Sequence, residues 1–230
     1  MILSMQTIEL KNYVSKQLDN FFPDQYKLVG QDIDSAFALA IERLENCFKY
    51  ISVSSYSNNK GITYFSHLHS DQYAQFLYFF SNSLWKLSEN KPICDKLIFL
   101  NRVLNNMFIS YKCSLPDIFF LGHSIGSIIG NAVYSDFLVV FQNVTINTSA
   151  DELGGPAPVL GKGLFLGTGA KIIGNKTIGD RVSIGVDAVV FNQMIDQDSV
   201  VIRNSLGTIE INPRKKRQCM AQNYFNVEIK

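Results

Sequence analysis

The chain has 230 residues, of which 18% are charged and 47% are hydrophobic, and its 21 Lys and Arg nearly balance its 20 Asp and Glu. A net charge of +1 excludes a generally basic nucleic-acid-binding protein and a protein with an acidic tail. Typical soluble domains carry about 25% charged residues. The low share of charge therefore indicates a chain that buries much of its surface.

The sequence also carries signals of cellular compartment. No apolar run approaches the roughly 20 residues that cross a bilayer, and Glu9 arrives too early for the apolar core of a signal peptide. The four cysteines form no CxxC pair. We therefore expect free thiols and a cytoplasmic protein without a membrane span.

Residues 1–112 are predicted to form an α-helical domain. Four segments have apolar residues at helical spacing: 7–22, 33–51, 71–87 and 92–107. Asp32 or Asp34 is the predicted N-cap of the second helix and Ser70 that of the third, while Pro92 suits the first turn of the fourth. The apolar faces are rich in Phe and Tyr, and periodic faces of this kind usually form the core of a helix bundle.

The second half follows a different period. An aliphatic residue recurs at every sixth position, in the order Leu160, Leu166, Ile172, Ile178, Ile184 and Val190. Glycine follows four of these six residues. A helix does not keep a period of six, and a strand alternates by two. The period predicts a triangular coil of short strands in which each aliphatic residue points inward and stacks on its equivalent eighteen residues away.

The coil is expected to occupy residues 113–206. Ile129, followed by Gly130, and the stretch 140–146 continue the aliphatic pattern upstream. The sequence NTSADELGGPAP then interrupts it, which predicts a loop over 147–159 and a candidate functional segment on a rigid scaffold. Residues 207–230 are predicted to form a C-terminal tail.

One short motif is misleading. Residues 122–126, GHSIG, match the G-x-S-x-G elbow of α/β-hydrolases, with Ser124 as the nucleophile. That fold requires a histidine downstream of the serine, and the three histidines of this chain are His67, His69 and His123. Because none follows Ser124, a hydrolase is rejected.

Three stretches carry a resemblance to a known family. HSIGSIIGNA (123–132), VFQNVTI (140–146) and LGTGAKIIGNKTIGDRVSIGVDAVV (166–190) resemble the serine acetyltransferase branch of the hexapeptide-repeat acyltransferases. The resemblance implies an α+β fold, with an N-terminal α-helical domain followed by a left-handed parallel β-helix. It also implies an acetyl-CoA-dependent O-acetyltransferase. Because active sites in the family lie between adjacent coils, it further implies a homotrimer or a dimer of trimers.

By this resemblance, His123 falls on the catalytic histidine of the family. Acyl transfer to a hydroxyl requires a base to take the hydroxyl proton, and an imidazole, with an unperturbed pKa of about 6.5, can accept a proton and later return it. The group that orients His123 is left open between Asp117, Asp136 and a backbone carbonyl.

Two departures from the family bear on the acceptor. Gly122 stands where the family has an acidic residue, and Ala157 stands where it has a second functional histidine. Serine is a zwitterion whose recognition needs charged partners, so we expect a surface-polysaccharide sugar slightly ahead of serine. N-acetylation of an amino sugar and a non-catalytic trimeric scaffold stay as alternatives.

Coenzyme A in the family lies in a groove between coils and is held by backbone groups. The resemblance places Gly167-Thr168 and Gly185-Val186 at these contacts. Lys215 and Lys216, in the basic stretch 214–217, are expected either to contact the phosphates or to form a solvated tail. No phosphate-binding glycine motif is present.

His67 and His69 have a spacing that could ligate a metal ion. Asp71 is the only nearby acid and no cysteine lies close in the sequence. We therefore expect a structural role at the start of a helix and no metal site.

Overall fold

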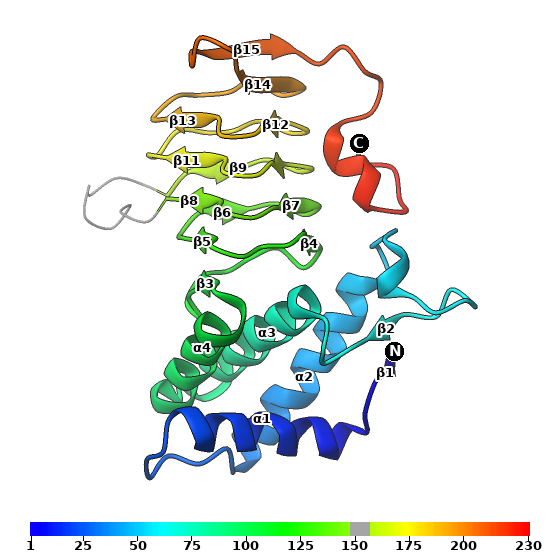
Figure 1. The fold of residues 1–230 in the computed structure, drawn as a ribbon, viewed down its shortest axis with the longest axis vertical. Helices are drawn as coiled ribbons and strands as arrows, with labels where there is room; N and C mark the ends of the chain where they lie inside the picture. Colours follow the sequence, from blue (N-terminus) through cyan, green and yellow to red (C-terminus); the bar gives the residue numbers. More distant parts are fainter. Residues whose placement is uncertain (148–156) are drawn as a thin grey trace. The chain divides into compact units, whose positions relative to one another are not determined.

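The computed structural model describes residues 1–147 and 157–230, which form two compact units (Figure 1). The first unit comprises residues 1–49 and 53–112, and the second comprises residues 50–52 and 113–230. Among the described residues, no helix combines the length and apolarity of a membrane span.

The first unit is built on four helices: α1 (Thr7–Phe21), α2 (Gln31–Phe48), α3 (Ser70–Ser88) and α4 (Lys91–Asn105). Two short strands, β1 (Ile2–Leu3) and β2 (Tyr64–Phe65), pair in parallel. The turn η1 (Ser54–Tyr56) and strand β3 (Phe108–Ile109) complete the unit.

Helix α3 forms the core of this unit, because every residue from 71 to 84 is buried. Phe37 of α2 packs edge-on against Phe76 and Phe80 of α3, with ring centroids 5.7 and 5.4 Å apart. Edge-to-face contacts of this kind stabilise aromatic cores beyond the area they bury. The predicted helix-bundle core is thus confirmed.

The helix caps differ from the predictions in two places. Gly30 precedes α2, and the carboxylate of Asp32 instead accepts hydrogen bonds from Ser88 Oγ (2.8 Å) and Asn90 Nδ2 (3.2 Å). His69, rather than Ser70, caps α3, since its side chain accepts the N–H of Gln72. Pro92 lies in the first turn of α4, as predicted.

The second unit is a parallel β-helix whose strands stack on three faces (Figure 1). One face, called the β4–β14 sheet below, contains β4 (Phe119–Leu121), β7 (Leu138–Val140), β10 (Phe165–Leu166), β12 (Ser183–Ile184) and β14 (Ser199–Arg203). The second face contains β5 (Ile128–Ile129), β8 (Thr145–Ile146), β11 (Lys171–Ile173) and β13 (Val189–Phe191). The third begins with β6 (Val133–Tyr134) and β9 (Val159–Leu160) and continues through single bridges at Ile178 and Ile195.

The strand register confirms the six-residue period. Three pairs of residues eighteen apart are aligned on neighbouring coils: Leu160 with Ile178, Leu166 with Ile184 and Ile172 with Val190. All six side chains are at most 2% exposed. Burial of stacked aliphatic side chains is therefore the main stabilising contribution inside the coil.

The residues predicted to form a C-terminal tail are folded onto the coil. Strand β15 (Ile209–Pro213) pairs antiparallel with β14, and the chain then forms the 3₁₀ helix η2 (Met220–Tyr224). The ring of Tyr224 stacks on Phe120 (centroids 4.9 Å apart) and Phe165 (6.1 Å). Because neighbouring Leu121 and Leu166 point inward, these two rings lie on the outer side of the β4–β14 sheet. The C-terminal segment covers this side.

Candidate active site

The corner that follows the β4–β14 sheet differs between the first coil and the next three. In the second coil this corner begins at Val140 and ends at Thr145, five positions further along the chain. The third and fourth coils have the same interval of five positions. In the first coil, seven positions lead from Leu121 to Ile128. Two additional residues are therefore inserted at the first corner.

His123 lies in this insertion. Its backbone is left-handed (φ 50°) and the residue is exposed, whereas the following Ser124 is only 2% exposed. Left-handed residues also stand at the same corner of later coils, at Asn143 and Asp187, so this backbone conformation belongs to the tight corner. The insertion places the histidine at the surface of the coil, where a substrate can reach it.

Four residues occupy equivalent positions in successive corners and form what we call the corner column: Ile125, Gln142, Thr168 and Val186. Hydrogen bonds of 2.9 Å connect the successive members of this column. In each of them the backbone carbonyl of Ile125, Gln142 or Thr168 accepts an N–H from the next coil, and the donor is the residue immediately after the next column member. Thr168 and Val186 therefore lie on adjacent coils of one column. His123, two residues before Ile125, lies at the end of the same column.

Asp117 and Asp136 lie at the other end of the β4–β14 sheet. The carboxylate of Asp136 accepts the backbone N–H of Ile118 at 3.1 Å, and Asp117 is exposed. Both acids precede their strand whereas His123 follows β4. At about 3.3 Å per extended residue, six residues separate Asp117 from His123 by on the order of 15–20 Å. Strand β4 thus keeps both carboxylates away from His123 within one chain.

Gly122 is enclosed by aromatic rings. A Cβ atom at this position would lie 3.0 Å from the ring of Phe120 and 3.1 Å from that of Phe141. Phe141 therefore fills the space that a side chain at Gly122 would need. This contact gives a structural reason for glycine where the resembling family has an acid.

Ala157 is half-buried and directly follows the undescribed residues. Most of the loop predicted over 147–159 falls on residues 148–156, which lie outside the described residues. Asn147, where the description stops before this gap, is 2% exposed.

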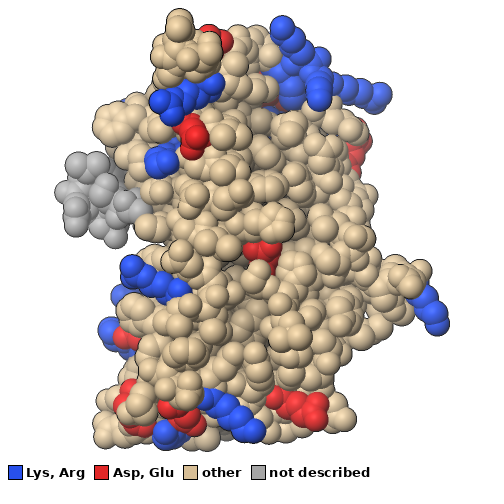
Figure 2. Space-filling model, in the orientation of Figure 1, with Lys and Arg blue, Asp and Glu red and all other residues tan. Residues whose placement is uncertain are grey.

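The basic stretch after β15 divides into two parts. Lys215 and Lys216 are exposed. Because Pro213 pairs with Ser199, the first residue of β14, these lysines lie at the end of the β4–β14 sheet opposite to the corner column. In Figure 2, Lys and Arg side chains gather near β15, whereas the middle of the coil shows mostly uncharged surface.

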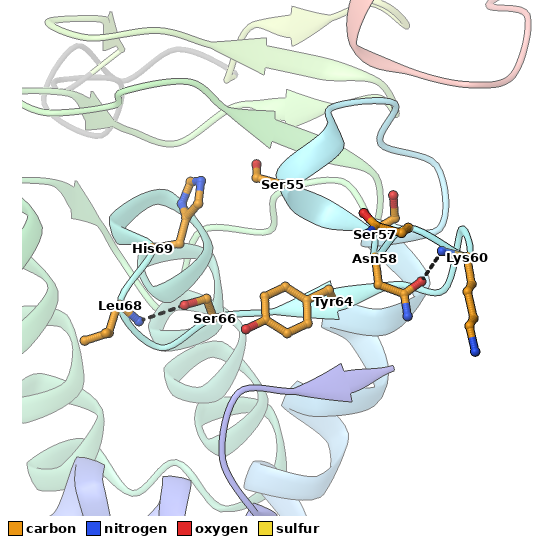
Figure 3. Close-up of a pocket in the computed structure, with 9 residues that line it drawn as sticks. Ser55, Ser57, Asn58, Lys60, Tyr64, Ser66, Leu68 and His69 are labelled. Carbon is orange, nitrogen blue, oxygen red and sulfur yellow. Dashed lines mark hydrogen bonds between the residues drawn. The ribbon is translucent and has the colours of Figure 1, made fainter.

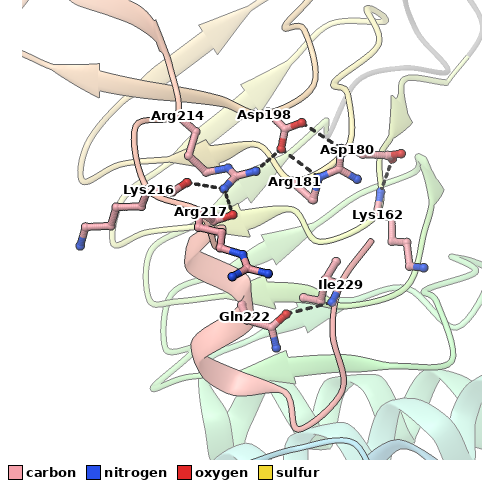
Figure 4. A network of polar contacts seen from close by, with 9 residues as sticks. All are labelled: Lys162, Asp180, Arg181, Asp198, Arg214, Lys216, Arg217, Gln222 and Ile229. Carbon is pink, nitrogen blue, oxygen red and sulfur yellow. Dashed lines mark hydrogen bonds and ion pairs between the residues drawn. The ribbon is translucent and has the colours of Figure 1, made fainter.

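Arg214 belongs instead to a network that fastens the C-terminal segment to the coil (Figure 4). Arg181 donates two hydrogen bonds of 2.9 Å to the carboxylate of Asp198, and Arg214 donates to the same carboxylate and to the carbonyls of Lys216 and Arg217. The hydrogen bonds from Arg181 and Arg214 hold the pKa of Asp198 well below its usual range. Arg214 is thus committed to the fold.

The helical unit has a separate hollow of about 710 Å³ (Figure 3). The carboxamide of Asn58 accepts the backbone N–H groups of Lys60 and Ile62, and Ser66 Oγ accepts that of Leu68. These hydrogen bonds shape the turns that line the hollow.

His69 also lines the hollow and caps α3, while Nδ1 of His67 lies 2.8 Å from Ser4 Oγ. Within the described ranges, 1–147 and 157–230, no three His, Cys, Asp or Glu side chains converge as a metal site would require.

The sequence was compared with known proteins. No family model matches the chain. It is 30% identical over 119 residues to the serine acetyltransferase of Synechococcus elongatus, covering 51% of this chain and 49% of that protein. It is 31% identical over 114 residues to the enzyme of the same name from Bacillus pumilus, covering 46% and 52%. The chain therefore spans about half the length of these curated relatives.

Solved structures extend the likeness in fold. The serine acetyltransferase of Vibrio cholerae has a TM-score of 0.65 at 22% identity, covering 83% of this chain and 73% of that one. Isoform 3 from Entamoeba histolytica, solved with cysteine, has a TM-score of 0.59 at 19% identity, covering 92% and 73%. A further serine acetyltransferase, solved with CoA, has a TM-score of 0.55 at 20% identity, covering 86% and 73%. The predicted fold, an α-helical domain followed by a left-handed parallel β-helix, is thus confirmed, and the chain is similar to the serine acetyltransferases in both sequence and fold.

Proposed function

We propose that this protein is an acetyl-CoA-dependent O-acetyltransferase in which His123 acts as the general base. The observation that carries the proposal is the two-residue insertion that presents His123 at the end of the corner column. Sequence similarity to serine acetyltransferases, over about half of the chain, supports the same activity.

The reaction requires one group that accepts and returns a proton. The imidazole of His123 takes the proton of the acceptor hydroxyl while the hydroxyl oxygen attacks the thioester carbonyl. The C–O bond forms, the C–S bond breaks, and the imidazolium returns the proton to the departing thiolate. No metal ion or redox partner enters this balance.

The donor would extend from His123 along the corner column. The backbone at Thr168 and Val186 would contact its pantetheine arm, beside Gly167 and Gly185. The latter two glycines approach the next coil closely, because a Cβ atom on either would lie 3.2 Å from a backbone oxygen there. A bulky residue at these positions would therefore disturb the groove.

We also propose a homotrimer, in which the groove of one chain faces a neighbouring coil. Lys215 and Lys216 lie away from the corner column of their own chain, so a contact with CoA phosphates would come from the neighbouring chain. Light scattering on the purified protein tests the assembly. A mass of three chains, or of six, is expected, and a monomer would contradict the proposal.

For the acceptor, we place a neutral sugar of the kind found in surface polysaccharides slightly ahead of serine. Phe141 occupies the space beside Gly122, so no acidic side chain there can pair with the ammonium group of an amino acid. Aromatic rings are common partners of apolar ligand faces. Serine is the acceptor that the names of the relatives imply for those proteins, and it is included in the test.

The test is release of free thiol from acetyl-CoA in the presence of serine, neutral sugars and amino sugars. We expect turnover with a hydroxyl acceptor and a loss of about 10²- to 10⁴-fold in His123→Ala, which is typical for removal of a general base. Lys16→Ala, at an exposed position on α1, should leave the rate unchanged.

Each alternative gives a different result. Turnover with serine alone would overturn the preference for a sugar. N-acetylated product would indicate an N-acetyltransferase. No turnover with any acceptor would favour a non-catalytic scaffold, and full activity of a folded His123→Ala variant would eliminate the proposed mechanism.

A further inference from the structure

Gln142 carries an unsatisfied polar atom beside the candidate site. Its side-chain oxygen Oε1 is buried and has no hydrogen-bond partner among the described residues. Buried polar atoms in native proteins nearly always have a partner, and an exception calls for an explanation such as a ligand. The backbone carbonyl of the same residue is satisfied, since it accepts the N–H of Gly169 at 2.9 Å.

The position of Gln142 defines which ligand could supply the missing donor. It occupies the corner column one coil before Thr168 and one coil after the insertion that carries His123. Adjacent coils are about 4.8 Å apart. Gln142 therefore lies between the proposed base and the proposed contacts of the pantetheine arm.

The backbone carbonyls of the first three members of the column are already used. The backbone carbonyls of Ile125, Gln142 and Thr168 each accept an N–H from the next coil. The side-chain oxygen of Gln142 is an acceptor that these ladder hydrogen bonds do not use. An extended chain that lies along the column and carries an amide N–H could satisfy it once the carboxamide turns outward, because Oε1 faces the chain's own atoms in this structure.

We propose that Gln142 Oε1 accepts a hydrogen bond from the amide N–H of the pantetheine arm nearest the thioester. This inference rests on the proposed function and deepens it. The hydrogen bond fixes the arm two carbon atoms from the sulfur and so holds the thioester carbonyl beside His123. Gln142 is thus a donor-binding residue that positions the reacting group.

Two small donors isolate this hydrogen bond. S-acetyl-N-acetylcysteamine carries the amide N–H at the same distance from the sulfur as in coenzyme A. Its ester analogue, S,O-diacetyl-mercaptoethanol, has an oxygen in place of that N–H. We expect the wild-type protein to favour the amide donor by about tenfold in kcat/KM, the effect of one well-made hydrogen bond.

Substitution of Gln142 should act on only one of these donors. Gln142→Met keeps a similar side-chain length but removes the acceptor, so kcat/KM should fall about tenfold for the amide donor and stay unchanged for the ester. Gln142→Glu keeps an acceptor oxygen and should preserve the preference. Gln193→Met, the same change at an exposed coil position, should alter neither value.

An equal amide-to-ester ratio in the wild-type protein and Gln142→Met would overturn the inference, because a structural role would affect both donors alike. Failure of the proposed function is a separate result, namely no turnover of acetyl-CoA with any acceptor. In that case calorimetric titration with CoA decides. Weaker binding by folded Gln142→Met than by Gln193→Met supports the contact, whereas equal affinity or no binding to the wild-type protein overturns it.

Discussion

The ring of Phe141 lies directly against Gly122, the residue that precedes His123. A Cβ atom on Gly122 would come within 3.1 Å of that ring. The two residues stand on adjacent coils, so the ring on one coil limits which residue can stand next to the histidine on the other. An acidic neighbour of His123 and the present ring cannot both be accommodated without a shift.

This contact predicts an overpacking penalty. Gly122→Ala should lower the free energy of unfolding by about 1–3 kcal/mol, the usual cost of forcing atoms into a filled space. In a Phe141→Leu background the same change should cost less, because the smaller side chain gives way. Urea unfolding of the four proteins measures the coupling, and an equal cost in both backgrounds would contradict the contact.

The aromatic contact of the C-terminal segment predicts a second effect on stability. Tyr224→Ala should lower the free energy of unfolding by about 1–3 kcal/mol, since it removes the stacking on Phe120 and Phe165. Tyr224→Phe keeps the ring and should behave like the wild-type protein. Limited proteolysis should cut residues 214–230 faster in Tyr224→Ala alone. Equal cutting in all three proteins would show that the stacking does not hold the segment.

The network around Asp198 predicts acid sensitivity of the same segment. Hydrogen bonds from Arg181 and Arg214 lower the pKa of Asp198 in the folded protein, whereas an unfolded chain has an aspartate pKa of about 3.9. A lowered folded pKa means that the contribution is complete above about pH 4 and is lost as the pH falls through the folded pKa.

Thermal unfolding between pH 2.5 and 7 measures this dependence. Asp198→Asn should be less stable at neutral pH, and its stability should fall less steeply below pH 4 than that of the wild-type protein. Parallel curves for the two proteins would exclude Asp198 as the acid-sensitive group.

The cysteines predict low thiol reactivity in the native state. All four are buried and none forms a disulfide with another described residue, and burial raises the pKa of Cys94 to about 12 and that of Cys113 to about 11. Only the thiolate reacts quickly with disulfide reagents. At pH 8 we expect slow labelling of the native protein and rapid labelling of four thiols in denaturant. Fast native labelling at Cys113, identified by mass spectrometry, would contradict its burial.

The positions of the elements could be predicted where the pattern is local. The start of α1 at Thr7, the place of Pro92 in α4 and the inward column from Leu160 to Val190 all follow from residue spacing. The cap of α2 could not be predicted, because Asp32 is engaged by Ser88 and Asn90, more than fifty residues away. Local capping rules do not include such contacts.

In the candidate site, too, some residues could be predicted from the sequence and others could not. His123, Thr168 and Val186 were all identified from their places in the stretches that resemble a known family. Gln142 was missed because the sequence between residues 146 and 160 breaks the six-residue period, so its equivalence to Thr168 is hidden. The interpretation of residues 207–230 as a tail missed β15 and η2 for a related reason, since Tyr224 contacts Phe120 across about a hundred residues.

The amino-acid sequence by itself determined that this chain has a helical unit and a coil of short parallel strands with an aliphatic interior. It could do so because helical and six-residue periods are set by neighbouring residues. Only the tertiary structure decided which residues stand beside His123, because those neighbours come from other coils. Their identity depends on the strand register, on the two residues inserted at one corner and on the ring that closes over Gly122.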